Sequence, residues 1–167
     1  MEIGAEEPHV FEVEPLNGES LSHFLGRFRR ENYLTSSQLG KLTGLGAVIL
    51  RWEKLYFNPF PTRQELEAMA SVVRVDADRL TQMLSSKGVT MKPRPIRLCA
   101  ACYAEQPCHR IEWQFKEKMK CDRHQLRLLT KCTNCETPFS IPADWVQGEC
   151  PHCFLPFTTM AKRQKSR

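Results

Sequence analysis

The sequence predicts a small, mainly α-helical protein in which an N-terminal helix-turn-helix domain is followed by two zinc-ribbon or knuckle-type zinc fingers. Two observations lead to this prediction. In the first half of the chain, apolar residues recur at helical spacing behind residues that cap helices. In the second half, all eight cysteines follow residue 98, and six of them form pairs separated by two residues, a spacing typical of zinc ligands.

The composition is that of a globular protein. The 167 residues are 41% hydrophobic and 26% charged, enough for one ordinary domain or two small ones. The N-terminus lacks the apolar stretch of a signal peptide, and the longest aliphatic run, residues 47–50, is far shorter than the ~20 residues of a membrane span. We therefore expect a soluble intracellular protein, whose eight cysteines are better explained by metal binding than by disulfides.

The chain begins with an acidic segment, residues 1–19, that we expect to be a flexible tail. Residues 1–20 contain six Glu and no Lys or Arg, so they carry a charge of −6. Val10 and Phe11 belong to a small apolar cluster in this segment. If the tail instead becomes ordered on a partner protein, these two side chains are candidate contacts.

Residues 20–90 are expected to form the helix-turn-helix domain. Ser20 is the expected cap of its first helix, whose apolar residues recur at i, i+3, i+4 and i+7. These residues are Leu21, Phe24, Leu25 and Phe28. Thr35 and Gln38 form a capping box that opens a second helix, and the glycine-containing turn at residues 43–46 ends it.

Three more helices complete this domain. The third is expected over residues 47–57, where Pro59 prevents it from continuing. A second capping box, Thr62 with Glu65, opens a fourth helix, and a fifth is expected over about residues 77–84.

The succession, whose last helix is capped by Asp76, resembles the helix-turn-helix of phage-repressor type over roughly residues 33–85. A recognition helix reads base edges with polar side chains near its N-terminal end. Residues 44–49 are all glycine or apolar here, so we do not expect sequence-specific base reading. Exposed apolar residues usually mark a protein interface, although Val48 and Ile49 could equally face the core. The candidate docking residues of this domain are Leu45, Val48, Ile49 and Trp52.

Residues 91–98 are expected to be an extended linker, because Pro93 and Pro95 disfavour helix in the residues before them. The next segment, residues 99–160, is expected to form a double zinc-finger module. It is followed by a short basic tail, residues 161–167.

Four ligand pairs carry the zinc prediction, since two intervening residues let one turn direct both side chains at one ion. The pairs are Cys99/Cys102, Cys121/His124, Cys132/Cys135 and Cys150/Cys153. Sequential pairing is favoured, because a cross-braced RING arrangement has fewer residues between its second and third pairs than the seven found here. Four protein ligands per site leave no open position for water, so we expect two structural Zn²⁺ ions. Cys108 and His109 are interpreted as ordinary residues, and His152 is an alternative ligand to Cys153.

Residues 110–119 are expected to form a helix in which Trp113 and Phe115 pack over the zinc core, with stacking on bases as the alternative. Basic side chains make a second candidate site, for the backbone of a nucleic acid. They are Lys116, Lys118, Lys120 and Arg123 of the zinc module and Arg27, Arg29 and Arg30 of the first helix. No Ser/His/Asp set, phosphate-binding loop or three-ligand metal site is evident, so we do not expect an enzyme.

Together these residues resemble the TniQ family of transposition proteins. The resemblance depends on Cys99-x-x-Cys102, on Cys108-His109-Arg110-x-x-Trp113 and on the knuckles that begin at Cys121 and Cys132, and residues 18–25 match the opening helix of the family. Because the chain ends soon after Cys153, it resembles the short forms found in CRISPR-associated transposons with a single-protein effector.

The resemblance implies a non-catalytic adaptor of RNA-guided DNA transposition in the bacterial cytoplasm. Its implied partners are a TnsC-type AAA+ ATPase, a target-bound CRISPR effector with its guide RNA, and the backbone of the target DNA, with neither a membrane nor a small-molecule substrate. The alternative is a helix-turn-helix and zinc-finger transcription regulator, which would need polar side chains at residues 45–49.

Overall fold

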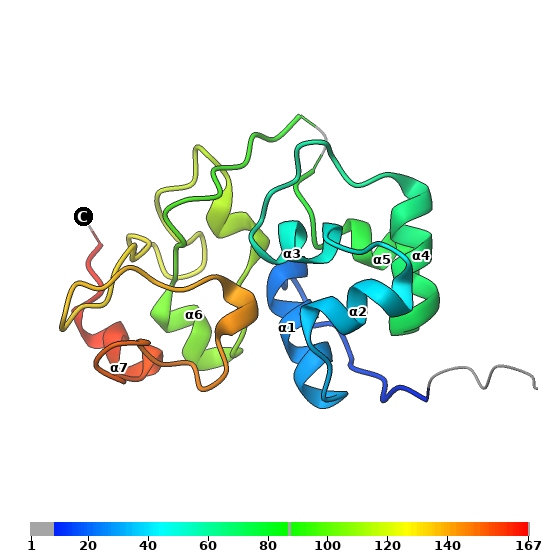
Figure 1. Ribbon diagram of the computed structural model, residues 1–167. Coiled ribbons are helices and arrows are strands. Elements are labelled where there is room, and N and C mark those ends of the chain that lie inside the picture. Colours follow the sequence, from blue (N-terminus) through cyan, green and yellow to red (C-terminus); the bar gives the residue numbers. More distant parts are fainter. Residues whose placement is uncertain (1–8, 87, 167) are drawn as a thin grey trace, which may run out of the picture.

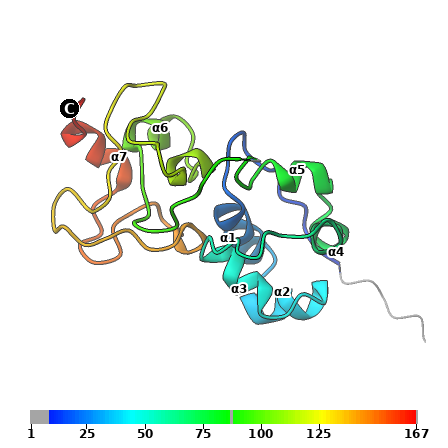
Figure 2. The ribbon, with the colours of Figure 1, turned by 90° about the horizontal axis from the view of Figure 1, so that it is seen from above.

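The computed structural model describes residues 9–86 and 88–166 and consists of two halves lying side by side (Figure 1). The helical half contains α1 (Leu21–Glu31), α2 (Ser36–Thr43), α3 (Val48–Glu53), α4 (Arg63–Val73) and α5 (Ala77–Thr81). The cysteine half, which begins at residue 91, contains α6 (Ala100–Glu105), α7 (Phe157–Met160) and the 3₁₀ helices η1 (Ile111–Gln114), η2 (Pro142–Asp144) and η3 (Ala161–Arg163). A view from above places α1 and α3 on the side of the helical half that faces the cysteine half, with α2, α4 and α5 farther away (Figure 2).

The predicted helix caps are confirmed. The Ser20 side chain accepts the His23 N–H at the start of α1, and the Asp76 side chain accepts the Asp78 N–H at the start of α5. Thr35 and Thr62 each form a complete capping box at the starts of α2 and α4. The helix-rich fold therefore follows from local signals that the sequence displays.

Helix α3 is shorter than predicted and ends at Glu53 instead of continuing to residue 57. Its carbonyls are capped by the next turn, in which the N–H of Leu55 bonds to Trp52 O (3.0 Å) and that of Tyr56 to Arg51 O (2.9 Å). This is the pattern of a Schellman motif, which usually has glycine where Leu55 adopts a φ of 64°. Because Leu55 is buried in the core of the cysteine half, packing offsets its backbone strain.

The prediction of a helix over residues 110–119 is wrong, because only the short 3₁₀ helix η1 forms there. The carbonyl groups that would accept the next helical hydrogen bonds have other partners. Gln114 O accepts the Lys92 N–H (2.7 Å), and Phe115 O accepts from the Arg97 guanidinium (3.1 Å). Residues 91–98, which we expected to be a linker, therefore lie against the cysteine half, and Ile96 and Leu98 are buried in its core.

Helix α1 is buried on nearly all sides because it contacts both halves. Its apolar face packs into the core of the helical half through Leu21, Phe24, Leu25 and Phe28, together with Leu39, Ile49, Trp52, Leu66, Met69 and Val73. Its other face is small or polar, with Ser22, His23 and Gly26 all buried. One helix thus completes an apolar core and provides a docking face.

The cysteine half docks on this face through η2. A Cβ atom at Gly26 would lie 2.2 Å from the Ala143 carbonyl oxygen, so only glycine fits there. That carbonyl accepts a hydrogen bond from Arg30 Nη1 (2.7 Å), and the Ala143 N–H donates to Ser22 Oγ (3.1 Å). Backbone and side-chain bonds to the same residue fix the position of η2 along α1.

A buried histidine joins the halves at the N-terminus of α1. The Ser20 N–H donates to the His109 carbonyl (2.8 Å), and the Ser20 hydroxyl lies 2.8 Å from His109 Nδ1. His109 Nε2 lies 3.2 Å from Gln114 Oε1, which accepts only, so Nε2 carries the proton and Nδ1 accepts from Ser20. Burial lowers the pKa of His109 to about 3, so this imidazole is neutral near pH 7.

Residues 9–16 of the predicted acidic tail lie along the helical half, residues 17–19 also bond to Arg110 and Ile111 of the cysteine half, and residues 1–8 lie outside the described part. Asn32 exchanges hydrogen bonds with the backbone of Phe11. Glu19 is fully buried and accepts from Arg27 Nη2 (2.7 Å) and from His23. Burial alone would raise the pKa of Glu19, but the bonds from Arg27 and His23 lower it. The buried Glu19 carboxylate therefore stabilises the folded structure through its bonds to Arg27 and His23.

Within the residues that the structure describes, no helix is both long and apolar enough to cross a membrane.

Candidate metal centres

The structure brings the eight predicted metal ligands into two clusters of four. Cys99, Cys102, Cys121 and His124 form the first cluster, and Cys132, Cys135, Cys150 and Cys153 form the second. Within each cluster the ligand atoms all lie within 4.8 Å of one another. This grouping is the sequential pairing that the sequence favoured, and each cluster could hold a metal ion.

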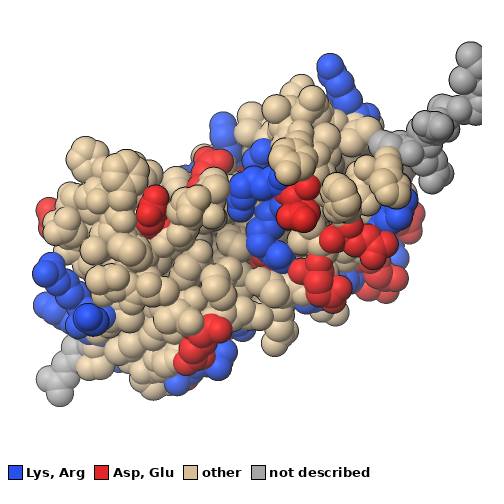
Figure 3. All heavy atoms as spheres, turned by 90° about the horizontal axis from the view of Figure 1, so that it is seen from below, with Lys and Arg blue, Asp and Glu red and all other residues tan. Residues whose placement is uncertain are grey.

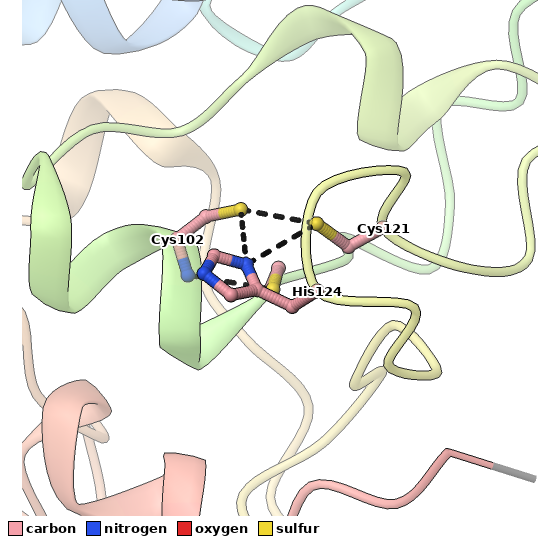
Figure 4. Close-up of side chains that lie close together, drawn as sticks. Cys102, Cys121 and His124 are labelled. Atoms are coloured by element: carbon pink, nitrogen blue, oxygen red, sulfur yellow. Dashed lines mark hydrogen bonds between the residues drawn. The ribbon is translucent and has the colours of Figure 1, made fainter.

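The first cluster lies between α6 and the loop that carries Cys121 and His124 (Figure 4). Cys102 Sγ lies 3.1 Å from Cys121 Sγ and 3.3 Å from His124 Nδ1, and the Cys121 Sγ to His124 Nδ1 distance is 3.6 Å. A tetrahedral zinc site requires about 3.8 Å between two sulfurs and about 3.5 Å between sulfur and nitrogen. The two sulfur–nitrogen separations are within about 0.2 Å of this geometry, whereas the sulfur–sulfur separation is about 0.7 Å shorter. The sulfurs are nevertheless too far apart for a disulfide bond of ~2.05 Å.

The sulfur separations in the second cluster are longer and nearer to those of a tetrahedral zinc site. Cys132 Sγ lies 3.6 Å from Cys153 Sγ, and Cys135 Sγ lies 3.5 Å from Cys150 Sγ. All four thiols are free of disulfides. Hydrogen bonds to Thr137 lower the pKa of Cys135 to about 6, which favours the thiolate form that binds metal.

Three of the four ligand pairs share one backbone structure, beginning at Cys121, Cys132 and Cys150. In each, the N–H of the first ligand bonds to the carbonyl five residues later, and its carbonyl accepts the N–H four residues later. The residue directly after the second ligand has a positive φ: Gln125 55°, Glu136 63° and Phe154 63°. This strained turn directs two ligands to one point, and metal binding would offset its conformational cost.

The remaining pair uses a helix instead. Cys99 caps α6, its Sγ accepting the Cys102 N–H (3.4 Å), so the first helical turn presents both sulfurs on one side. Gln164 Oε1 lies 3.8 Å from Cys99 Sγ and 3.3 Å from the Ala101 N–H. The C-terminal segment thereby packs directly behind the first cluster.

Glu105 orients the only histidine of the two clusters. Its Oε1 lies 2.6 Å from His124 Nε2, leaving Nδ1 directed at the cysteine sulfurs, and Arg123 pairs with Oε2 of the same carboxylate (2.8 Å). A carboxylate on the far nitrogen fixes the ring of a metal-ligating histidine and makes it a better ligand. Glu105 was not among the residues predicted, because nothing in the sequence relates it to a ligand nineteen residues away.

The donor sets fit structural zinc. Cysteine thiolates and imidazole are the ligands that zinc prefers, and four protein donors leave no position for water or substrate. Burial alone would raise the pKa of Cys121, but hydrogen bonds to Cys102 and to His124 lower it to about 7. Cys108 lies outside both clusters, where burial raises its pKa to about 12, and exposed His152 is also not part of a cluster.

Trp113 lies where the sequence predicted. It is fully buried in the core that contains Cys99, Cys102 and Cys121, and Phe115 packs against this core. Trp113 therefore stabilises the cysteine half and is not free to stack on bases, whereas Phe115 is half-buried.

The predicted docking residues divide into exposed and buried side chains. Ile49 and Trp52 are fully buried in the helical half and Val10 is buried beside them, so these three cannot form a docking surface in this conformation. Phe11 is 58% exposed, and Leu45 and Val48 are half-buried. Leu50, which was not among the predicted docking residues, is 45% exposed near the start of α3.

The arginines predicted to contact nucleic acid are engaged within the protein. Arg27 binds Glu19, Arg29 pairs with Glu53 (2.5 Å) and Arg30 binds Ala143 O. In the cysteine half, Lys118 pairs with Asp122 and Arg123 with Glu105, whereas Lys116 and Lys120 are exposed. The predicted basic residues thus divide into side chains bonded within the protein and the two exposed lysines, Lys116 and Lys120.

Comparison with known families gives one result. The family model described as TniQ matches residues 10–128, more than two thirds of the chain, and covers the helical half and the first cluster. No curated protein sequence matches the chain.

Proposed function

This chain belongs to the TniQ family, and from that membership we propose that it is a non-catalytic adaptor of RNA-guided DNA transposition in the bacterial cytoplasm. TniQ proteins are accessory proteins of transposition, so a role with the transposition machinery follows from the family. The finer proposal is that this protein links a TnsC-type AAA+ ATPase to a target-bound CRISPR effector and its guide RNA.

The observation that supports an adaptor best is the fixed docking of the two halves on α1. Gly26, Ser22 and Arg30 contact one residue of η2, and Ser20 contacts His109, so two different surfaces are held at one relative position. An adaptor must transmit the position of one partner to the other. Rigid coupling through a shared helix meets that requirement.

We propose that Zn²⁺ occupies both clusters and acts structurally. Bound zinc supplies much of the folding free energy of small modules, on the order of 10 kcal/mol per site. With four protein ligands each, the clusters hold and orient the cysteine half, and no reaction is assigned to them.

We propose that the ATPase docks on the apolar end of α3. Leu50 is exposed, and Leu45 and Val48, which precede it in the chain, are half-buried. The corresponding end of a DNA-reading helix would carry hydrogen-bonding side chains. An exposed apolar cluster at this place favours a protein partner.

The test is a pull-down of a TnsC homologue by the purified protein, with and without ATP. We expect the wild-type protein to retain the ATPase and Leu50→Glu to lose it. Val146→Glu is the matched control, since Val146 is also apolar and 61% exposed but lies in the cysteine half. Equal retention by wild type and both variants would contradict docking on α3, and no retention by any of them would contradict the link to the ATPase.

The alternative function, a transcription regulator, makes a different prediction for the same surface. It requires base recognition, yet Leu45, Val48 and Leu50 offer no hydrogen-bonding group to a base edge. Selection from a random duplex library separates the two functions. A single enriched consensus sequence would favour the regulator.

A further inference from the structure

The cysteine half contains a basic groove of about 590 Å³, and four separate segments line it. They are residues 92–97, 116–119, 127–136 and 163–165. Eight of the lining residues are Lys or Arg and only Glu136 is acidic. The sequence identified Lys116 and Lys118 as basic candidates but could not show that these four segments meet.

Three of the eight basic groups are engaged in the fold. Arg97 donates to Phe115 O and Lys118 O, Lys118 pairs with Asp122, and Lys131 pairs with Glu136 (3.1 Å). The other five have no ion-pair partner among the residues described, and of these five only Arg163 makes a side-chain bond within that part of the chain, a long one from Nη1 to Thr133 O (3.4 Å). The five are Lys92, Lys116, Arg127, Arg163 and Lys165. These five charges are available to a ligand in the groove.

The predicted basic tail forms one wall of this groove. Gln164 is buried, and its Nε2 donates to Arg127 O (3.0 Å) while its Oε1 faces Cys99 and Ala101. The Arg127 N–H donates to Lys165 O (2.7 Å). The residues on either side of Gln164, Arg163 and Lys165, are therefore held at the groove, so binding through them costs less conformational entropy than binding through a free tail.

The charge of the groove remains strongly positive when the metal clusters are included. Cys132 belongs to the lining, and a zinc ion with four thiolates carries −2. Subtracting that charge and Glu136 from the eight bases leaves about +5. The opposite sign gathers elsewhere: viewed from below, Asp and Glu lie mainly near the N-terminal segment, and a group of Lys and Arg lies at the end beside the C-terminus (Figure 3).

We propose that this groove binds the sugar-phosphate backbone of a double-helical nucleic acid. The inference rests on the proposed function and deepens it, since it assigns the nucleic-acid contact to one surface of the cysteine half. A polyanion with regularly spaced charges matches a groove with free bases from separate segments. The described lining residues include no aromatic ring, so the groove lacks the stacking platform that proteins use for single strands.

The test measures binding of the metal-loaded, full-length protein to fluorescent 20-base-pair duplexes by anisotropy, at salt concentrations from 50 to 300 mM. The groove variant is Lys116→Gln/Arg127→Gln/Arg163→Gln. The control variant, Lys41→Gln/Arg63→Gln/Arg74→Gln, also removes three positive charges, but from exposed positions of the helical half. Metal content and circular dichroism of both variants verify folding.

We expect the wild type and the control to bind duplexes with similarly steep salt dependence. The groove variant should bind at least about tenfold more weakly at low salt, and its slope of log affinity against log salt should fall by about 2 to 3, because each phosphate contact contributes ~0.7 to 0.9. Separate DNA, RNA and hybrid duplexes identify the source of the backbone. A single strand of equal length should bind more weakly.

Equal salt slopes for the groove variant and the control would overturn the proposal. So would displacement of the duplex by poly-glutamate at an equal charge concentration, which would assign the groove to an acidic protein. The adaptor function is tested independently, because the groove variant retains Leu50 and should still bind the ATPase in the pull-down. Loss of duplex binding with ATPase binding intact supports the groove and leaves the adaptor standing.

Discussion

The two halves of this protein reach a buried core by different means. The helical half packs large apolar side chains such as Phe24, Phe28 and Trp52 between five helices, and four of these helices begin with a side-chain cap. In the cysteine half, most elements are shorter, and its core is built around Cys99, Cys132 and the other ligands. A core that contains its metal ligands should depend on the metal, whereas the helical core should depend on apolar volume.

Loss of a metal ligand tests this contrast with the largest expected effect. Cys121→Ser should abolish binding at the first cluster and unfold the cysteine half, at a cost on the order of 10 kcal/mol, while the helices of the other half persist. Trp113 and Trp145 lie in the cysteine-half core, so their near-ultraviolet dichroism should disappear while most of the helical signal at 222 nm remains. A metal titration monitored by both dichroism signals measures how much of each half depends on the metal.

Cys108→Ser is the control for that experiment, because Cys108 is equally buried but lies in neither cluster. It should still bind two metal ions per chain in native mass spectrometry. Concurrent loss of both dichroism signals from Cys121→Ser would show instead that the two halves unfold as one unit.

A cavity in the helical core has the next largest effect. Leu25→Ala should destabilise the protein by about 2–5 kcal/mol, because the side chain is fully buried between α1 and its neighbours. Leu50→Ala removes the same atoms from an exposed position and should change stability by less than about 0.5 kcal/mol. Urea unfolding measures both. Metal content should be unchanged in both variants, since neither residue belongs to the cysteine-half core.

The contact between the halves can be weakened without altering either core. Gly26→Ala places a methyl group against the Ala143 carbonyl and should destabilise the docked state by about 1–3 kcal/mol. Hydrogen exchange should increase at the Ala143 N–H, which donates to Ser22, and remain unchanged in α4. Ser37→Ala, at an exposed position of α2, is the control and should change neither the stability of the docked state nor the exchange at Ala143. Unchanged exchange at Ala143 in the Gly26 variant would contradict the assigned role of this contact.

The features that could be predicted from the sequence depend on local signals, and those that could not depend on long-range contacts. Caps such as Thr35 and Thr62 and the ligand pairs act over three residues, so their consequences could be predicted locally. The failures concern long-range contacts. The chain after Gln114 turns because residues 92 and 97 bond to its carbonyls, and α3 ends at a Schellman motif formed by Leu55, whose strain is offset by burial in the other half. The basic groove combines four segments, so no single stretch of sequence predicts it.

The smallest predicted effect concerns the buried imidazole between the halves. The pKa of His109 is lowered to about 3 by burial, whereas the unfolded chain has an ordinary value near ~6.5. Between these two values the unfolded state binds more protons, so stability decreases as the pH falls below about 6.5. From pH 7 to pH 5.5 this group should cost the wild type about 1 kcal/mol.

His109→Gln isolates this contribution, because the metal ligands and their own proton competition are the same in both proteins. The amide can still bond to Ser20 or Gln114 but does not titrate, so the variant should be less stable at pH 7 yet lose less stability between pH 7 and 5.5. Urea midpoints at the two pH values, with metal in excess, give the difference. An equal loss of stability in the two proteins between pH 7 and 5.5 would mean that His109 is charged in the folded state. The assignment of a neutral imidazole between α1 and the cysteine half would then be wrong.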